Sequence, residues 1–152
     1  MVEDKLRVMG IELPAAPAPL ASYVPAVRAG GLVFTSGQLP LVDGQIVHKG
    51  KVGGGVDVQT AYQAARQCAV NCLAVVKGLT GSLDQVARIV KVTGYVASAP
   101  GFNEQPKVVN GASDLLVEVF GEAGRHARAA VGVSELPLDA PVEVEMVVQL
   151  VE

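Results

Sequence analysis

The chain has 152 residues, of which 50% are hydrophobic and 18% are charged, and its formal net charge is −3. This length fits a single domain over residues 1–152, and the hydrophobic fraction exceeds what a small monomer has to bury, which favours contacts between subunits. Lysines and arginines are scattered and aromatic residues make up only 4%, so a nucleic-acid partner is not expected.

The N-terminal residues 1–22 are predicted to form a short helix over 3–9 and then a Pro/Ala-rich extended arm over 14–19. They lack the apolar stretch of a signal peptide, and no uncharged run in the chain could span a bilayer. We therefore expect a cytoplasmic protein without a membrane partner. The elements predicted next are strands at 24–28 and 32–36, a turn at 43–44, an edge strand at 46–48 and a flexible joint at 53–55.

Small apolar residues recur at helical spacing over about 57–79 and predict a long helix packed on a sheet. Its cysteines, Cys68 and Cys72, are one turn apart, which suits a disulfide poorly and favours a buried face in a reducing compartment. Ser82 is expected to cap one short turn. The remaining predicted elements are a strand at 89–98, a helix at 104–120 and strands at 128–133 and 142–151. In the strand at 89–98, alternation predicts one face with Val90, Val92 and Val96 and another with Lys91, Thr93 and Tyr95.

The predicted order β-β-α-β-α-β-β indicates an α+β fold with two helices on one face of a mixed sheet. The other face of that sheet then needs a cover, and oligomerisation would supply it.

Arg128 is the strongest candidate for a functional residue. Small and β-branched residues surround it, so its guanidinium is expected to be half-buried and to need an anionic partner. That partner is either a carboxylate of the protein, Glu143 or Glu145, or the carboxylate of a bound ligand, which the planar guanidinium suits. The residues alone leave both alternatives open.

Glu143 and Glu145 alternate with apolar residues and share one face of the last strand. Such a pair can be simply the solvent side of the strand, or Glu143 can be a base that holds a water. In a simple hairpin of the last two strands, Arg128 would lie opposite Gln149 and roughly 20 Å from Glu143. If both serve one site, they come from different subunits.

Three further residues are weaker candidates. Tyr23 is either a packing ring at a strand start or part of a site, and Ser36-Gly37 is either a strand end or a source of backbone N–H groups for an anion. No spacing typical of metal ligands or of a catalytic triad is present, and His48 and His126 are expected to be surface or hydrogen-bonded histidines.

These residues together resemble the Rid family, the YjgF-like reactive-intermediate deaminases, over roughly residues 16 to 152. The resemblance rests on Tyr23, on Phe34-Thr35-Ser36-Gly37-Gln38-Leu39-Pro40, on Ala127-Arg128-Ala129, and on Leu136-Pro137 followed by Val142-Glu143-Val144-Glu145. It implies a chorismate-mutase-like fold and a homotrimer whose sheets form a central barrel, with clefts between subunits.

The resemblance also implies roles for individual residues. Arg128 would grip the substrate carboxylate and Glu143 would position the hydrolytic water. The residues implied to line the cleft are Tyr23, Ser36, Gly37, Asn110 and Ala130. Asn110 is one residue off the family spacing, Ala130 stands where the family often has Cys, and His126 stands where it often has Pro or Ala.

The implied function is hydrolysis of reactive enamine or imine intermediates to a 2-oxo acid and ammonia, without a cofactor or metal. One alternative is a non-catalytic trimer that binds a small carboxylate or regulates another process. Another is a ribonuclease, a label carried by some relatives, which the acidic charge and few aromatics disfavour here.

Overall fold

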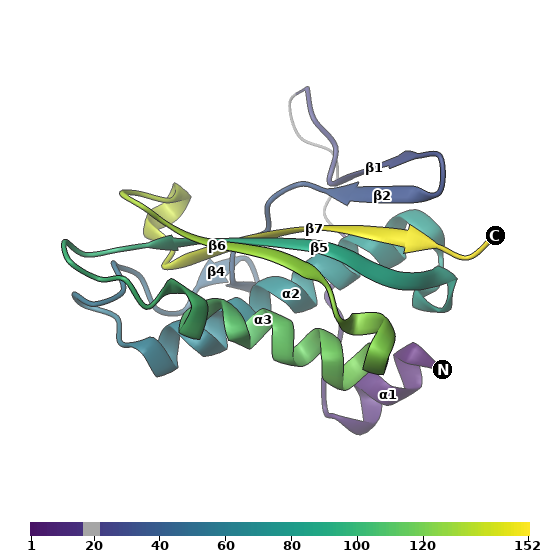
Figure 1. Ribbon diagram of the computed structural model, residues 1–152, viewed down its shortest axis with the longest axis horizontal. Coiled ribbons are helices and arrows are strands. Elements are labelled where there is room, and N and C mark those ends of the chain that lie inside the picture. The colour runs from purple at the N-terminus through teal and green to yellow at the C-terminus, as the bar shows by residue number, and fades with distance from the viewer. Residues whose placement is uncertain (17–21) are drawn as a thin grey trace.

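The computed structural model describes residues 1–16 and 22–152, so residues 17–19 of the predicted arm lie outside the described residues. A mixed sheet runs in the order β1-β2-β7-β5-β6, with β5 and β6 parallel and the other neighbours antiparallel. Its strands are β1 (Ala26–Ala29), β2 (Leu32–Thr35), β5 (Val86–Ala97), β6 (Ala127–Val133) and β7 (Val142–Leu150). The long helices α2 (Val58–Thr80) and α3 (Gln105–Phe120) lie on one side of it, which confirms the predicted α+β class (Figure 1).

The last two strands do not form the simple hairpin considered above, because β5 lies between β6 and β7. The helix α3 carries the chain from the end of β5 back to the start of β6, and a crossover of this kind makes the two strands parallel. The chain then passes through the 3₁₀ turn η3 (Pro137–Asp139) to the other side of β5. Arg128 therefore pairs with Val92 of β5 rather than with Gln149 of β7.

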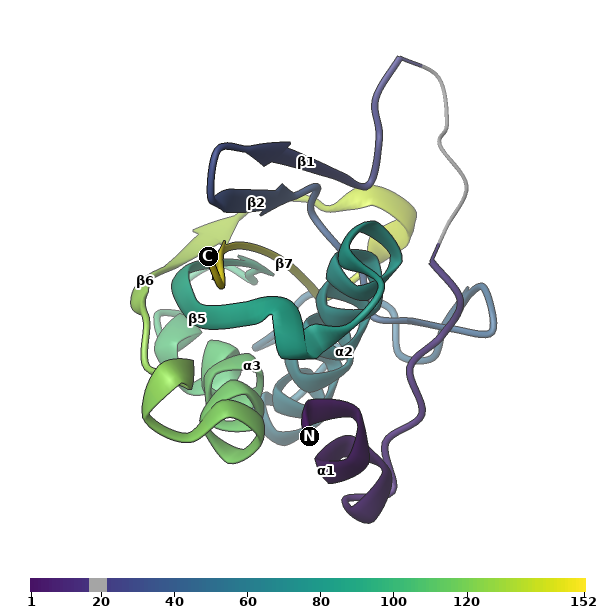
Figure 2. The same ribbon diagram turned by 90° about the vertical axis from the view of Figure 1, so that its right-hand side faces the viewer.

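Particular residues define both ends of α2 and allow α3 to pack closely against it. Asp57 caps α2 by accepting a hydrogen bond from the Thr60 N–H at 2.7 Å, and Gly81 ends the helix in the left-handed conformation with φ of +85°. Gly111 lets α3 approach α2 closely, since a Cβ there would collide with the Tyr62 carbonyl oxygen. Figure 2 shows the two helices side by side beneath the sheet.

The predicted helix-face cysteines are free and fully buried between α2 and β7. The Sγ atoms of Cys68 and Cys72 lie 3.6 and 3.3 Å from the carbonyl oxygens of Val142 and Val144. Burial raises the pKa of both thiols, that of Cys72 to about 12. The core around them is aliphatic and includes Leu73, Val92, Val96, Leu115 and Met146.

Smaller elements lie at the periphery. The helix α1 (Val2–Val8) buries Leu6, and Glu3 accepts a hydrogen bond of 2.7 Å from the Leu83 N–H. Leu83 opens the 3₁₀ turn η1 (Leu83–Gln85), which Ser82 caps as predicted. The predicted edge strand at 46–48 is instead β4 (Gln45–Ile46), which pairs with β3 (Leu41–Val42) in a separate two-stranded sheet.

The sheet face away from α2 and α3 exposes large apolar side chains. Val27, Phe34 and Val131 are 52%, 44% and 43% exposed. Within the described ranges, no helix is long and apolar enough to cross a membrane. An uncovered apolar sheet face of this kind is typical of surfaces that contact another subunit.

Candidate active site

Arg128 reaches from the edge strand β6 toward α3. Its Nη1 donates to Asn110 Oδ1 at 2.8 Å and to Ser113 Oγ at 3.2 Å. Over residues 1–16 and 22–152, no carboxylate lies within 4.0 Å of the guanidinium. The intrachain salt bridge to Glu143 or Glu145 is therefore not formed, and Arg128 is held by neutral groups.

The contacts of Arg128 leave one side of the guanidinium open. Asn110 and Ser113 take up both protons of Nη1, whereas in the described part of the chain nothing accepts from Nε or Nη2. These two nitrogens form the edge that binds a carboxylate through parallel hydrogen bonds. Arg128 also lines a cavity of about 260 Å³, together with Asn110, Ser113, Val117, Arg125 and His126.

His126 joins this group through Ser113. Its Nδ1 lies 2.6 Å from the Gly124 carbonyl oxygen, which can only accept, so Nδ1 carries the proton. Its Nε2 lies 2.9 Å from Ser113 Oγ and accepts the hydroxyl proton when the ring is neutral. Burial, followed by the charge of Arg128, lowers the pKa of His126, against the opposing effect of the Gly124 carbonyl.

Ala130 is less directly connected to Arg128. It pairs with Gly94 of β5 and packs against the core as a partly buried residue. Its side chain is not among those lining the cavity at Arg128. Of the residues predicted for the carboxylate site, Arg128 and Asn110 are thus in contact, whereas the Ala130 side chain does not line the cavity.

Glu143 lies on the opposite face of the sheet. It pairs with Tyr95 of β5, and Glu145 pairs with Thr93, so all four side chains share the face away from the helices. Glu143 is half-buried, and burial, followed by the charge of Glu145, raises its pKa. A carboxylate with a raised pKa in a partly dry position is suited to exchanging a proton with water.

Ser36-Gly37 lies beside Glu143, between two residues that pair with β7: Phe34 with Val147 and Gln38 with Val144. Ser36 is tied to the entry of β1, because its N–H donates to the Pro25 carbonyl and its Oγ donates to the Val24 carbonyl, each at 2.7 Å. Gly37 lies against Glu143, since a Cβ at this position would overlap Glu143 Oε1. The Ser36 N–H is already donated, whereas no acceptor for the Gly37 N–H lies among residues 1–16 and 22–152, so this N–H is the one that could meet a ligand.

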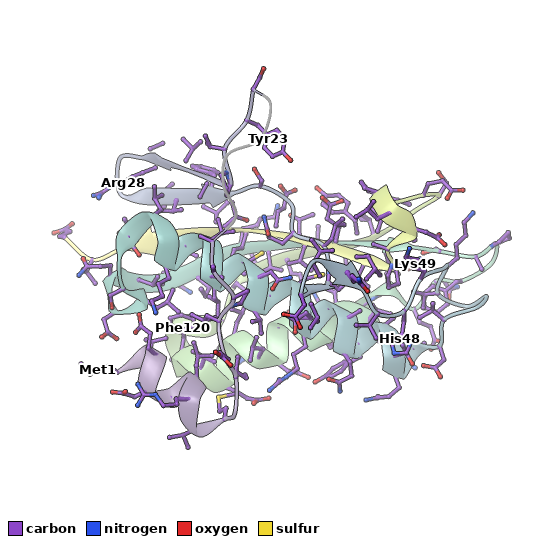
Figure 3. The ribbon with its side chains drawn as sticks, turned by 180° about the vertical axis from the view of Figure 1, so that it is seen from behind. Met1, Tyr23, Arg28, His48, Lys49 and Phe120 are labelled. Atoms are coloured by element: carbon purple, nitrogen blue, oxygen red, sulfur yellow. The ribbon has the colours of Figure 1, made fainter. Side chains whose placement is uncertain are left out.

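Tyr23 lies next to Val24 on the segment that leads into β1 (Figure 3). It is 59% exposed, so within the described residues it is not the packing ring that one interpretation expected. Glu143 and the adjacent Gly37, with Ser36 and the predicted cleft residue Tyr23, are called the glutamate site below. Arg128, Asn110, Ser113 and His126 form the arginine site.

Sequence reasoning did not identify two of the neighbouring polar residues as site members, Ser113 and Tyr95. Ser113 lies three positions after Asn110, which places both on one face of α3 and could have indicated it. Tyr95 was predicted only to share a strand face with Lys91 and Thr93, and Glu145 was considered as a partner of Arg128 or as part of the solvent side. The Tyr95 hydroxyl donates to Glu145 Oε1, and this bond, with burial, raises the pKa of Tyr95 to about 12.

The two sites do not meet within one chain. Arg128 pairs with buried Val92 and faces the helices, whereas Glu143 pairs with Tyr95 and faces away from them. Two strand spacings and three residues of rise separate their Cα atoms by about 14 Å. No group of three or more potential ligands among His, Cys, Asp and Glu in the part that the structure covers is placed to hold a metal ion.

Comparison with known proteins gives a consistent result over nearly the whole chain. Residues 3–150 match the family described as "YjgF/chorismate mutase-like, putative endoribonuclease". Protein TCP17 of Trypanosoma cruzi is 46% identical over 150 residues, which are 98% of this chain and 94% of that protein. The 2-iminobutanoate/2-iminopropanoate deaminase of Dermatophagoides farinae is 33% identical over 138 residues, 91% of this chain and 93% of that protein.

A solved structure extends the likeness to the fold. The crystal structure of Atu1372 from Agrobacterium tumefaciens, a protein of unknown function, has a TM-score of 0.92 and 48% identity, covering 99% of this chain and 92% of that one. The mixed sheet with its two covering helices is thus the chorismate-mutase-like α+β fold. Because the match extends from α1 to the end of β7, this chain belongs to the YjgF/Rid family.

Proposed function

We propose that this protein hydrolyses small imines that carry a carboxylate, giving a 2-oxo acid and ammonia. The observation that carries the proposal is the state of Arg128. Among the described residues, the half-buried guanidinium is held only by Asn110 and Ser113, and nothing accepts from its Nε or Nη2. Arg128 also lines a cavity, so this group calls for an external anion.

Glu143 supplies the second requirement of the reaction, a group that holds a water. Its raised pKa and its contact with Gly37 favour a carboxylate poised to accept a proton from water. The water oxygen bonds to the imine carbon, and Glu143 passes one water proton to the imine nitrogen. The carbon–nitrogen bond then breaks as the remaining hydroxyl proton moves to the nitrogen, and ammonia leaves with the 2-oxo acid. Arg128 keeps the carbon in place, so positioning supplies the main part of the rate gain.

Both groups serve one reaction only when two chains meet, since a single chain holds them about 14 Å apart on opposite sheet faces. We propose a homotrimer in which the arginine site of one subunit faces the glutamate site of the next. The exposed Val27, Phe34 and Val131 support a covered sheet face. The name of the Dermatophagoides farinae relative supports the substrate class.

A trimer that binds a carboxylate without turning it over is the second candidate. It is favoured by the same feature, the open edge of Arg128, because that edge explains binding whether or not Glu143 acts. The two candidates differ in what Glu143 does. In the binding-only candidate, the acid on β7 has no chemical role.

The test is an assay of 2-iminobutanoate hydrolysis with the wild type, Arg128→Ala and Glu143→Gln. We expect Arg128→Ala to lower kcat/KM by roughly 100-fold and to weaken binding of 2-oxobutanoate. We expect Glu143→Gln to lower kcat by a similar factor while binding is kept. Wild-type hydrolysis no faster than the protein-free reaction would exclude the enzyme, and retained Arg128-dependent binding in that case would favour the binding-only candidate.

A further inference from the structure

A continuous chain of hydrogen bonds runs from Arg128 to a histidine. Arg128 Nη1 donates to Ser113 Oγ at 3.2 Å, and Ser113 Oγ lies 2.9 Å from His126 Nε2. The other ring nitrogen, Nδ1, is fixed by the Gly124 carbonyl at 2.6 Å. The proposed hydrolysis uses neither Ser113 nor His126 directly.

We propose that His126 and Ser113 are positioning residues that couple carboxylate binding at Arg128 to the uptake of one proton, held on His126 Nε2. The inference rests on the proposed function, because it takes Arg128 as the group that grips the ligand.

The Ser113 hydroxyl changes direction when His126 is protonated. While His126 is neutral, Nε2 has no proton and takes the hydroxyl proton of Ser113. Once Nε2 is protonated, it donates to Ser113 Oγ instead. The two lone pairs of Oγ are then used by His126 and Arg128, and the hydroxyl proton is free to turn to an oxygen of the ligand.

The charges at the site also favour protonation of His126 when a carboxylate binds. The free site has a positive guanidinium beside a half-buried ring, and burial with the Arg128 charge lowers the pKa of His126. A carboxylate bound on the open edge of Arg128 offsets that charge and raises the pKa of His126 again. In a partly screened site, two charges separated by the Arg128–Ser113–His126 hydrogen bonds change an equilibrium constant roughly three- to tenfold.

The other charged groups near His126 do not supply the coupling. Arg125 lines the same cavity but is ion-paired with Glu122 at 3.2 Å, and Arg88 of β5 donates to the Arg125 carbonyl at 2.8 Å. The side chains that α3 presents to the cavity are all uncharged: Asn110, Ser113 and Val117.

The linkage has a defined pH window. His126 has a higher pKa in the complex than in the free protein. Affinity for 2-oxobutanoate therefore rises as the pH falls from above the pKa of the complex to below the pKa of the free protein. Below both values the ring is protonated in both states and the affinity stops changing. We expect 2-oxobutanoate to bind three- to tenfold more tightly at the acid end of this window.

The experiment is calorimetric titration of the full-length protein with 2-oxobutanoate near pH 6, in two buffers of different ionisation enthalpy. The wild type is expected to take up a substantial fraction of a proton on binding. His126→Gln and Ser113→Ala are expected to take up much less, and His48→Gln, which alters an exposed histidine elsewhere, to match the wild type. Glu143→Gln removes the carboxylate that could take up the proton in place of His126, and this variant is expected to retain the uptake.

A second measurement uses the wild-type protein alone, so it does not depend on whether a variant folds. The chain has two histidines, so their ring resonances can be followed by NMR with and without saturating 2-oxobutanoate. The His126 midpoint is expected to move to higher pH on binding, and the His48 resonances serve as the internal reference. An unmoved His126 midpoint, uptake that survives in His126→Gln, or uptake lost in Glu143→Gln overturns the coupling and leaves the proposed function standing. Equal binding by the wild type and Arg128→Ala overturns the proposed function itself.

Discussion

Gly37 occupies a position where a side chain would overlap the carboxylate of Glu143, because an added Cβ would lie well within van der Waals contact of Oε1. The φ of Gly37 is not positive, so alanine suits the backbone there. The absence of a side chain at residue 37 therefore makes room for the acid rather than for a turn.

Gly37→Ala is expected to displace the Glu143 carboxylate and to lower kcat for imine hydrolysis about 10- to 100-fold. The free energy of unfolding should change by under about 1 kcal/mol, because the displaced group is the end of a flexible side chain. Gly31→Ala is the matched control, since nothing lies within 4 Å of a Cβ there. Equal kcat for the two variants would mean that the position of Glu143 is irrelevant to turnover.

Tyr95→Phe removes the hydroxyl that donates to Glu145 on the outer sheet face. We expect the protein to lose about 1–2 kcal/mol of unfolding free energy, measured by urea denaturation, because a bond to a partly buried charged acceptor is lost. Tyr62→Phe removes a similar bond, 2.6 Å to Asp114, at an exposed position and should cost less. A larger loss from Tyr62→Phe would contradict the difference in burial.

Sequence patterns predicted the long elements well because apolar periodicity is a local property. Alternation failed at one point, since a β-bulge between Ile89 and Lys91 buries Ile89 fully and leaves Val90 only partly buried. A bulge depends on the partner strand, which alternation along one strand does not describe. The same holds for the pairing of β6 with β5, which is decided by the crossover through α3.

The candidate site was predictable in its charged members and not in its connections. Arg128 and Glu143 are charges among apolar neighbours, which made them candidates, and the family resemblance then implied their roles. The neutral supports were harder to foresee. Ser113 is an ordinary helix residue until α3 is placed against β6, and only then does its hydroxyl lie between Arg128 and His126.

Glu143→Gln is expected to make the protein more stable at neutral pH and not at pH 4. The folded-state pKa of Glu143 is raised, so ionisation costs folding free energy as the pH rises through the unfolded and then the folded pKa. The gain from the neutral amide should stay below about 1 kcal/mol, since solvent screens a half-exposed group. Urea denaturation at both pH values checks this, and an equal difference at pH 4 and pH 7 would contradict it.

Cys68 and Cys72 are expected to resist modification in the native state. Both are fully buried with raised pKa values, so neither offers a thiolate near neutral pH. Ellman's reagent should react with neither thiol in the native protein and with both in urea. Rapid native labelling of either thiol would show that α2 opens from β7.

The bare sheet face provides the test of assembly. Val131 is 43% exposed on β6, and a charge placed there would be desolvated if a neighbouring subunit covers it. We expect Val131→Glu to shift sedimentation from a trimer to a monomer and to abolish imine hydrolysis, because the arginine and glutamate sites then no longer meet. Val47→Glu is the control for an added surface charge, since Val47 is 65% exposed and lies outside the five-stranded sheet. A wild type that sediments as a monomer, or a Val131→Glu variant that stays active as one, would refute a site shared between chains.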